Sequence, residues 1–229
     1  MLKSTEEISE LVFTPKTRNI IFGNLKKGLK CYYSFIEENK KFFDRSNIAN
    51  FFPAARAYAI ERQFAIEAEK ATSPFTFFNK ELGLFKFKVG FINLDGVIVS
   101  IAKTYKKDSL PSRSKYKIEL SKANVFEQEV KQLSLFDIEN IANSDDLLSE
   151  NTLNKPKYCI VTYGIMSDTL SHAKIIMPKS DYKGYQLNLD LMKSIELVEI
   201  EQNEEDEENI ATIKSELENH YVRKGEGNE

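Results

Sequence analysis

Apolar residues in the first third of the chain recur at three- and four-residue steps, which is the spacing of one face of a helix. The pattern predicts a helix from Thr17 to about Phe43. It breaks at Asn50–Pro53, where a proline near the first turn is typical of a new helix, and this second helix continues through residues 55–69. The apolar positions of the first helix are Ile21, Leu25, Leu29, Tyr32, Tyr33 and Ile36.

The middle of the chain changes to the patterns of β-strands. Two aromatic segments, 75–78 and 84–91, precede the turn signal Asn93–Gly96 and the strand-like segment 97–101. Together they predict an antiparallel β-meander with one apolar face. The opposite face would carry Lys86 and Lys88.

Regular patterns return towards the C-terminus. Residues 158–163 and 174–177 are strand-like, residues 186–198 fit either a strand or a helix, and residues 209–222 fit a helix. We therefore expect an α+β protein, with N-terminal helices packed on the antiparallel β-meander, further strands and a helical acidic C-terminus.

The expected organisation has four parts. Residues 1–136 would form a helix-plus-meander body, and 137–157 a flexible polar connector rich in Asn, Ser and Asp. Residues 158–200 would supply strands that complete the α+β body, and 201–229 an acidic tail with a short helix.

Composition limits the class of protein. A hydrophobic fraction of 41% in 229 residues, with 16 Phe, is enough for a sizeable core. The apolar runs are too short to cross a bilayer, and residues 1–7 lack the apolar core of a signal peptide. Two cysteines give neither a disulfide framework nor a zinc-ligand cluster. We expect a cytoplasmic protein without a cofactor, a bound metal or a membrane partner.

The net charge of −3 is unevenly distributed. Residues 201–229 hold ten acidic and three basic side chains, so the rest of the chain is basic. A basic cluster with Tyr105 and Tyr116 could contact nucleic-acid phosphates and stack on bases, although a solvated lysine-rich face accounts for it equally well. The acidic tail could shield this cluster. The candidate nucleic-acid-binding residues are Lys86, Lys88, Lys103, Lys106, Lys107, Arg113, Lys115 and Lys117.

One short motif points to a specific partner. Gln132, Leu133, Ser134, Leu135 and Phe136 resemble the binding motif for the bacterial sliding clamp, the β subunit of DNA polymerase III, at all five positions. The resemblance implies that Leu135 and Phe136 fill a hydrophobic pocket on the clamp. It also implies that Gln132 hydrogen-bonds beside that pocket and that Leu133 adds apolar contact. It covers five residues and therefore implies a partner, not a fold.

The same residues have a structural alternative. Phe126, Val130, Leu133 and Phe136 also lie at helical spacing, so an amphipathic helix could bury them in the core. In that case the chain would be an interaction protein that does not contact the clamp.

Enzymatic interpretations are weaker. Cys159 and His172 could be a nucleophile and a base, but Cys159 lies in an apolar segment that favours an inert buried thiol. A metal-dependent nuclease would need acidic residues near a lysine, and Asp95 with Lys103 is one such pair, although Asp95–Gly96 is also turn chemistry. Whether the protein is an enzyme stays open, and we favour an activity without catalysis.

The motif therefore predicts an accessory protein that docks on the sliding clamp. Docking would either recruit the protein to DNA or block replication, as in a toxin–antitoxin, phage-defence or other mobile-element protein. The alternatives are a DNA-acting nuclease and an interaction protein without a clamp contact.

Overall fold

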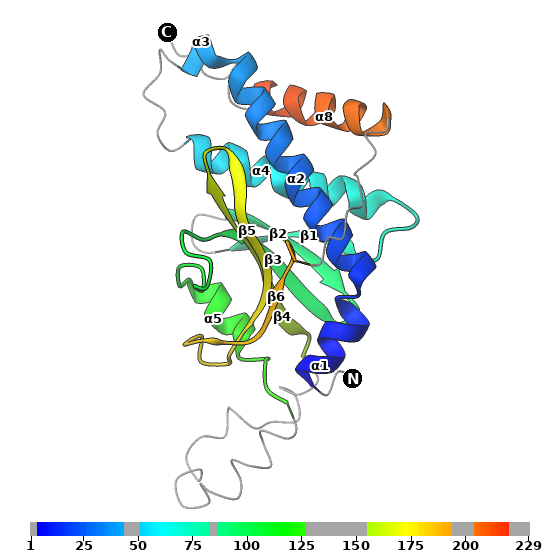
Figure 1. The fold of residues 1–229 in the computed structure, drawn as a ribbon, viewed down its shortest axis with the longest axis vertical. Helices are drawn as coiled ribbons and strands as arrows, with labels where there is room; N and C mark the ends of the chain where they lie inside the picture. Colours follow the sequence, from blue (N-terminus) through cyan, green and yellow to red (C-terminus); the bar gives the residue numbers. More distant parts are fainter. Residues whose placement is uncertain (1–3, 44–50, 83–86, 127–154, 194–203, 220–229) are drawn as a thin grey trace, which may run out of the picture. The chain divides into compact units, whose positions relative to one another are not determined.

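The computed structural model describes residues 4–43, 51–82, 87–126, 155–193 and 204–219. The chain divides into two compact units, each made of two separate stretches. The sheet unit comprises Met1–Arg18 and Phe78–Ser194, and the helical unit comprises Asn19–Phe77 and Ile195–Glu229. Helices and a six-stranded sheet confirm the α+β class (Figure 1).

Among the described residues, four helices belong wholly or mainly to the helical unit, and they occupy the segments whose apolar spacing predicts helices. They are α2 (Pro15–Glu38), α3 (Lys40–Phe43), α4 (Phe51–Glu69) and α8 (Glu204–Leu217). The start of α2 is encoded locally, because the Thr14 hydroxyl accepts a hydrogen bond from the Thr17 amide at 3.2 Å. Pro15 then occupies the first helical position, where no amide hydrogen is needed.

The core of the helical unit is built from aromatic and aliphatic side chains of these helices. Phe43 stacks on Phe51 with their ring centroids 4.8 Å apart. A Cβ atom added at Gly28 would lie 2.7 Å from the Ile60 Cα, so only glycine permits α2 and α4 to approach this closely. The fully buried members of this core include Cys31, Phe35, Ala55, Ala59, Ile213 and Leu217.

Helix α8 is part of this core, although its sequence lies in the acidic tail. Its apolar side covers α4 and α2 through Ile213 and Leu217, and Figure 1 shows it beside both helices. Glu216 accepts hydrogen bonds from the Arg62 guanidinium at 2.9 to 3.2 Å and from the Tyr58 hydroxyl at 2.9 Å. The Glu216 carboxylate is therefore committed to the helical unit.

Within its described residues, the sheet unit contains two short N-terminal helical segments, six strands and one further helix. Its elements are α1 (Thr5–Glu7), η1 (Ile8–Val12), β1 (Thr76–Leu82), β2 (Phe87–Leu94), β3 (Val97–Lys103), α5 (Lys115–Ser121), β4 (Lys157–Met166), β5 (Thr169–Pro178) and β6 (Tyr185–Asp190). The segment whose pattern fitted either a strand or a helix thus contains the strand β6.

The strands follow one another across the sheet in chain order. Strands β2 and β3 form the predicted hairpin, in which Asp95 and Gly96 have φ of 41° and 81° at the turn. However, β3 and β4 are parallel, with Val97 opposite Lys157 and Lys103 opposite Tyr163. The sheet is therefore mixed: the β2–β3 hairpin of the expected meander is antiparallel, as are β4–β5 and β5–β6, and the β3–β4 pair is parallel.

Strand β4 is buried on both faces, which explains its continuous apolar sequence. On one face, Tyr158 and Ile160 pack with Phe91 and Ile176 in a core to which α5 contributes Ile118. Helix α5 therefore packs on the face of the sheet that carries Tyr158 and Ile160.

Candidate functional site

Asn124 joins the end of the α5 region to two strands. Its side chain is 1% exposed and donates hydrogen bonds to the carbonyl oxygens of Tyr158 and Pro178, both at 2.8 Å. Its side-chain oxygen accepts a hydrogen bond from the Tyr158 amide at 2.7 Å. These three bonds fix the chain at residue 124 against the start of β4 and the end of β5.

Lys157, at the start of β4, makes a second connection, from the strand back to the segment that follows α5. Its ammonium is buried and donates hydrogen bonds to the carbonyl oxygens of Ala123 at 2.9 Å and Val125 at 2.7 Å. The same nitrogen lies 5.1 Å from the centroid of the Phe126 ring. A buried lysine is tolerated here because carbonyl oxygens and an aromatic face replace its hydration.

Asn124 and Lys157 therefore hold together the two chain segments that lead into and out of residues 127–154. The clamp-like motif, Gln132–Phe136, belongs to that interval and lies outside the described residues. The predicted connector at 137–157 lies there as well, except for its last three residues. Most of the alternative apolar stripe is likewise outside, although its first member, Phe126, is buried.

A second candidate region is the basic loop, which we define as residues 104–114 between β3 and α5. Four contacts fasten this loop to β5, β6 and the turn between them. Lys174 forms an ion pair with Asp108, and Lys107 lies 3.7 Å from Asp190. The Tyr182 hydroxyl donates to the Pro111 carbonyl oxygen at 3.2 Å, and the Arg113 guanidinium donates to the Asp181 carbonyl oxygen at 3.4 Å.

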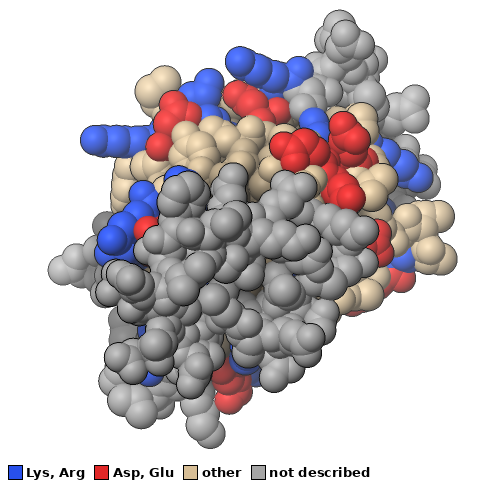
Figure 2. All heavy atoms as spheres, turned by 90° about the horizontal axis from the view of Figure 1, so that it is seen from below, with Lys and Arg blue, Asp and Glu red and all other residues tan. Residues whose placement is uncertain are grey.

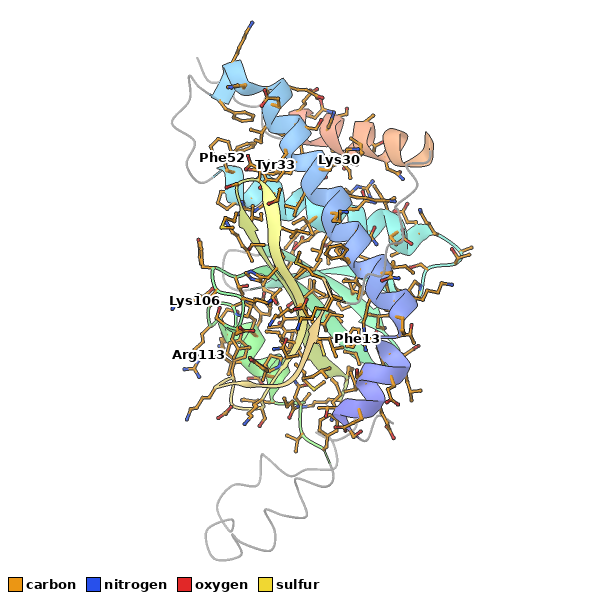
Figure 3. All side chains as sticks on the ribbon, in the orientation of Figure 1. Phe13, Lys30, Tyr33, Phe52, Lys106 and Arg113 are labelled. Atoms are coloured by element: carbon orange, nitrogen blue, oxygen red, sulfur yellow. The ribbon has the colours of Figure 1, made fainter. Side chains whose placement is uncertain are left out.

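Because these four contacts fix the backbone of the basic loop, some of its side chains are held pointing towards solvent. Tyr105 is 92% exposed, and the Lys103 ammonium lies 5.3 Å from the centroid of its ring. Lys106 is exposed, and Figure 3 shows Lys106 and Arg113 pointing away from the same side of the sheet unit. An exposed tyrosine beside lysines is a suitable platform for an unpaired base.

The remaining basic candidates do not all share this surface. Lys117 is only 7% exposed and donates to the Ser112 carbonyl oxygen at 3.2 Å, and burial lowers the pKa of its ammonium. Lys88 is exposed but lies on the opposite face of β2 from Val89. Lys115 lies on α5, and Lys86 is outside the described residues. On the face in Figure 2, basic and acidic side chains are interspersed.

A polar cluster beneath the basic loop was not predicted. His172 is 4% exposed, and its Nε2 lies 2.8 Å from the Thr104 hydroxyl. The imidazole ring occupies the space above Gly164, where any Cβ atom would overlap it. Burial lowers the pKa of His172, and the positive charges of Lys174 and Lys107 lower it further.

This geometry excludes the proposed pair of Cys159 and His172. His172 is opposite Gly164 in the β4–β5 ladder. Side chains alternate along a strand, so Cys159 points to the other face of the sheet. The thiol is fully buried, and burial raises its pKa. Cys159 therefore fits the inert buried thiol that its apolar segment favours.

The proposed acidic residue of a nuclease also has a structural role. Asp95 is exposed at the β2–β3 turn, in a backbone conformation that Asp and Gly favour. Among the described residues, no group of three or more His, Cys, Asp or Glu side chains could hold a metal ion.

Within the described part of the chain, no helix is long and apolar enough to cross a membrane. No family model, curated protein or solved structure matches this chain.

Proposed function

We propose that the protein binds the bacterial sliding clamp through Gln132–Phe136. The observation that carries the proposal is the agreement of this pentapeptide with the clamp-binding motif at all five positions. A short peptide ligand needs apolar anchors and a directional polar group, and the two leucines, Phe136 and Gln132 supply both.

The buried contacts at residues 124 and 157 support this proposal. They fix both ends of the interval that contains the pentapeptide to the sheet unit. A peptide attached at both ends has less conformational freedom to lose on binding than a free tail. Because both attachments lie on the folded body, the body would be brought to the clamp in a limited range of positions.

Such a contact has two uses. The clamp encircles DNA, so docking recruits a cytoplasmic protein to replicating DNA. Alternatively, occupation of the peptide pocket excludes a polymerase that carries the same type of motif. The second use would suit a toxin or phage-defence protein.

Calorimetric titration with purified β clamp tests the contact. We expect micromolar or tighter binding, typical of a well-anchored short peptide. The variant Gln132→Ala/Leu135→Ala/Phe136→Ala should lose it. Leu147→Ala/Leu148→Ala is the matched control, because it removes apolar side chains from the same interval but outside the motif. Equal loss in both variants, or no binding by the unmodified protein, would refute the proposal.

A competition experiment then distinguishes inhibition of replication from recruitment to DNA. If the protein blocks replication, it should inhibit clamp-dependent DNA synthesis with the same concentration dependence as clamp binding. If it is recruited to DNA, it should bind DNA-loaded clamps without inhibiting a polymerase supplied in excess.

The basic loop supports a second contact, with single-stranded DNA. Tyr105 is held outward beside Lys103 and Lys106, an arrangement suited to base stacking and phosphate contact. In fluorescence anisotropy with a labelled oligothymidylate, Tyr105→Ala should weaken binding by at least about fivefold, because stacking is worth roughly 1–3 kcal/mol per base. Unchanged binding by this variant would indicate that the loop is an ordinary charged surface and not a DNA contact. Lys179→Ala, at an exposed position in the β5–β6 turn, is the control.

A further inference from the structure

An apolar groove of about 670 Å³ lies in the sheet unit between the first three strands and α5. Its floor consists of side chains on one face of β1, β2 and β3, and its wall consists of one side of α5. This volume is within the range of small-molecule sites in proteins. The apolar lining residues are Phe78, Leu82, Val89, Phe91, Ile98, Tyr116 and Leu120.

The polar lining of the groove is predominantly basic. Lys80 on β1 and Lys115 on α5 both contribute to it, and Glu119 is its acidic member. The Glu119 carboxylate lies 3.0 Å from the Lys122 ammonium, which offsets its charge. The groove therefore presents an apolar surface with an excess of positive charge, which is complementary to an anion that carries an apolar body.

Ser114 adds an independent indication of a polar ligand. Its hydroxyl oxygen is buried and has no hydrogen-bond partner within the described structure, and the residue lines the groove. A buried hydroxyl without a partner is unfavourable by about 1–3 kcal/mol. A ligand oxygen that accepts a hydrogen bond from Ser114 would remove this penalty.

The arrangement of the aromatic rings favours a flexible chain over a flat ring. Phe91 stacks on Phe78 with centroids 5.6 Å apart, and meets the Tyr116 ring edge-on at 6.0 Å. These contacts already use one face of the Phe91 ring, so a planar ligand has only part of the aromatic surface, the 39% exposed Phe78, on which to stack. An alkyl chain gains apolar contact with such a surface without needing a free ring face.

We propose that this groove binds a fatty-acid-like carboxylate. The alkyl chain lies along Leu82, Val89 and Leu120, and the carboxylate is held by the Lys80 and Lys115 ammonium groups and the Ser114 hydroxyl. This site shares no residue with the clamp-like pentapeptide and does not rest on the proposed function.

Calorimetric titration of the full chain with dodecanoate, below the concentration at which it forms micelles, tests the site. We expect saturable binding with one site per chain. Dodecanol, which has the same chain without the charge, should bind at least about fivefold more weakly, as expected for the loss of two partly exposed ion pairs. Dodecyltrimethylammonium should not bind.

Two kinds of variant locate the ligand. Lys80→Ala/Lys115→Ala should weaken dodecanoate binding to the level of dodecanol, whereas Lys106→Ala/Lys179→Ala, which removes two lysines outside the groove, should not change it. Val89→Trp should obstruct the floor of the groove and weaken binding of both ligands. Because the lysine side chains are exposed, their variants should keep the circular dichroism and melting temperature of the unmodified protein.

The absence of dodecanoate binding would overturn the proposal. So would equal affinity for dodecanoate and dodecanol, or equal effects of the two lysine pairs, since either result would show that the groove does not select a carboxylate.

Discussion

The interiors of the two units are stabilised by different kinds of contact. The helical unit relies mainly on aromatic and aliphatic side chains, such as the Phe43–Phe51 stack and Leu217, together with the half-buried Arg62–Glu216 pair and one buried Asn24–Gln63 contact. The sheet unit buries polar groups deep in its interior, including Asn124 and Lys157. Loss of a buried polar partner leaves unpaired groups, whereas loss of an apolar group leaves a cavity. Substitutions in the two units should therefore destabilise them by different mechanisms.

The largest effect is expected at Asn124. Asn124→Ala removes three hydrogen bonds and leaves the Tyr158 amide and two carbonyl groups unpaired in the interior. We expect a loss of about 4 kcal/mol in the free energy of unfolding of the sheet unit. Hydrogen exchange measured by mass spectrometry should show faster exchange in β4 and β5 and unchanged exchange in α4. Equal acceleration in both units would mean that they unfold as one cooperative structure.

The next largest effect is expected at the contact of α8 with the other helices. Leu217→Ala deletes a fully buried side chain and should cost about 3 kcal/mol through lost burial and a cavity. Exchange should accelerate in α8 and α4 and stay unchanged in β4. Leu217→Met is the volume-conserving control and should cost less than about 1.5 kcal/mol. If α8 were dispensable to the helical unit, both substitutions would leave urea denaturation unchanged.

A smaller effect is expected at the charged pair of the helical unit. Glu216→Gln keeps the side-chain shape but removes the charge that the Arg62 guanidinium faces, and the Glu216 hydrogen bonds raise the pKa of Arg62. Both side chains are partly exposed, so we expect a loss of only about 1 kcal/mol. The difference between the variant and the unmodified protein should shrink in 1 M salt. A salt-independent difference would indicate that hydrogen-bond geometry, not charge, carries the contact.

The last expected effect is a pH dependence of the sheet unit, which appears only on acidification. Burial lowers the pKa of folded His172, so below about pH 6.5 the unfolded chain takes up this proton first. Stability should therefore fall as the pH decreases from 6.5 towards the folded pKa, by at most about 1.4 kcal/mol per pH unit from this group. His172→Gln should reduce the slope of stability against pH between 6.5 and 5. An unchanged slope would indicate that titratable groups other than His172 cause the pH dependence.

Local patterns were sufficient for most elements. The spacing of Ile21, Leu25 and Leu29 correctly predicted α2, and the Asn93–Gly96 turn correctly predicted the β2–β3 hairpin. The parallel pairing of β3 and β4 was not predictable in this way, because no local signal specifies which strands become neighbours across a long connection.

The candidate sites were predicted less completely. Lys117 and Lys157 can be buried because backbone carbonyl oxygens, distant in sequence or across a turn, accept hydrogen bonds from their ammonium groups, and charge alone does not reveal such partners. The contact of His172 with Thr104 likewise depends on the pairing of β4 with β3 and β5. The groove lysines, by contrast, were recognisable as basic residues, but their apolar surroundings arise only when α5 packs on the sheet.

The position of the His172 ring over Gly164 has an evolutionary consequence. Any side chain at position 164 would have to displace the imidazole, so the two positions cannot change independently. We expect that in descendants of this sequence glycine is retained at 164 wherever residue 172 is large, and that a larger residue at 164 is accompanied by a small one at 172. Such a paired substitution would also separate Thr104 from its partner, so three positions would diverge as a group.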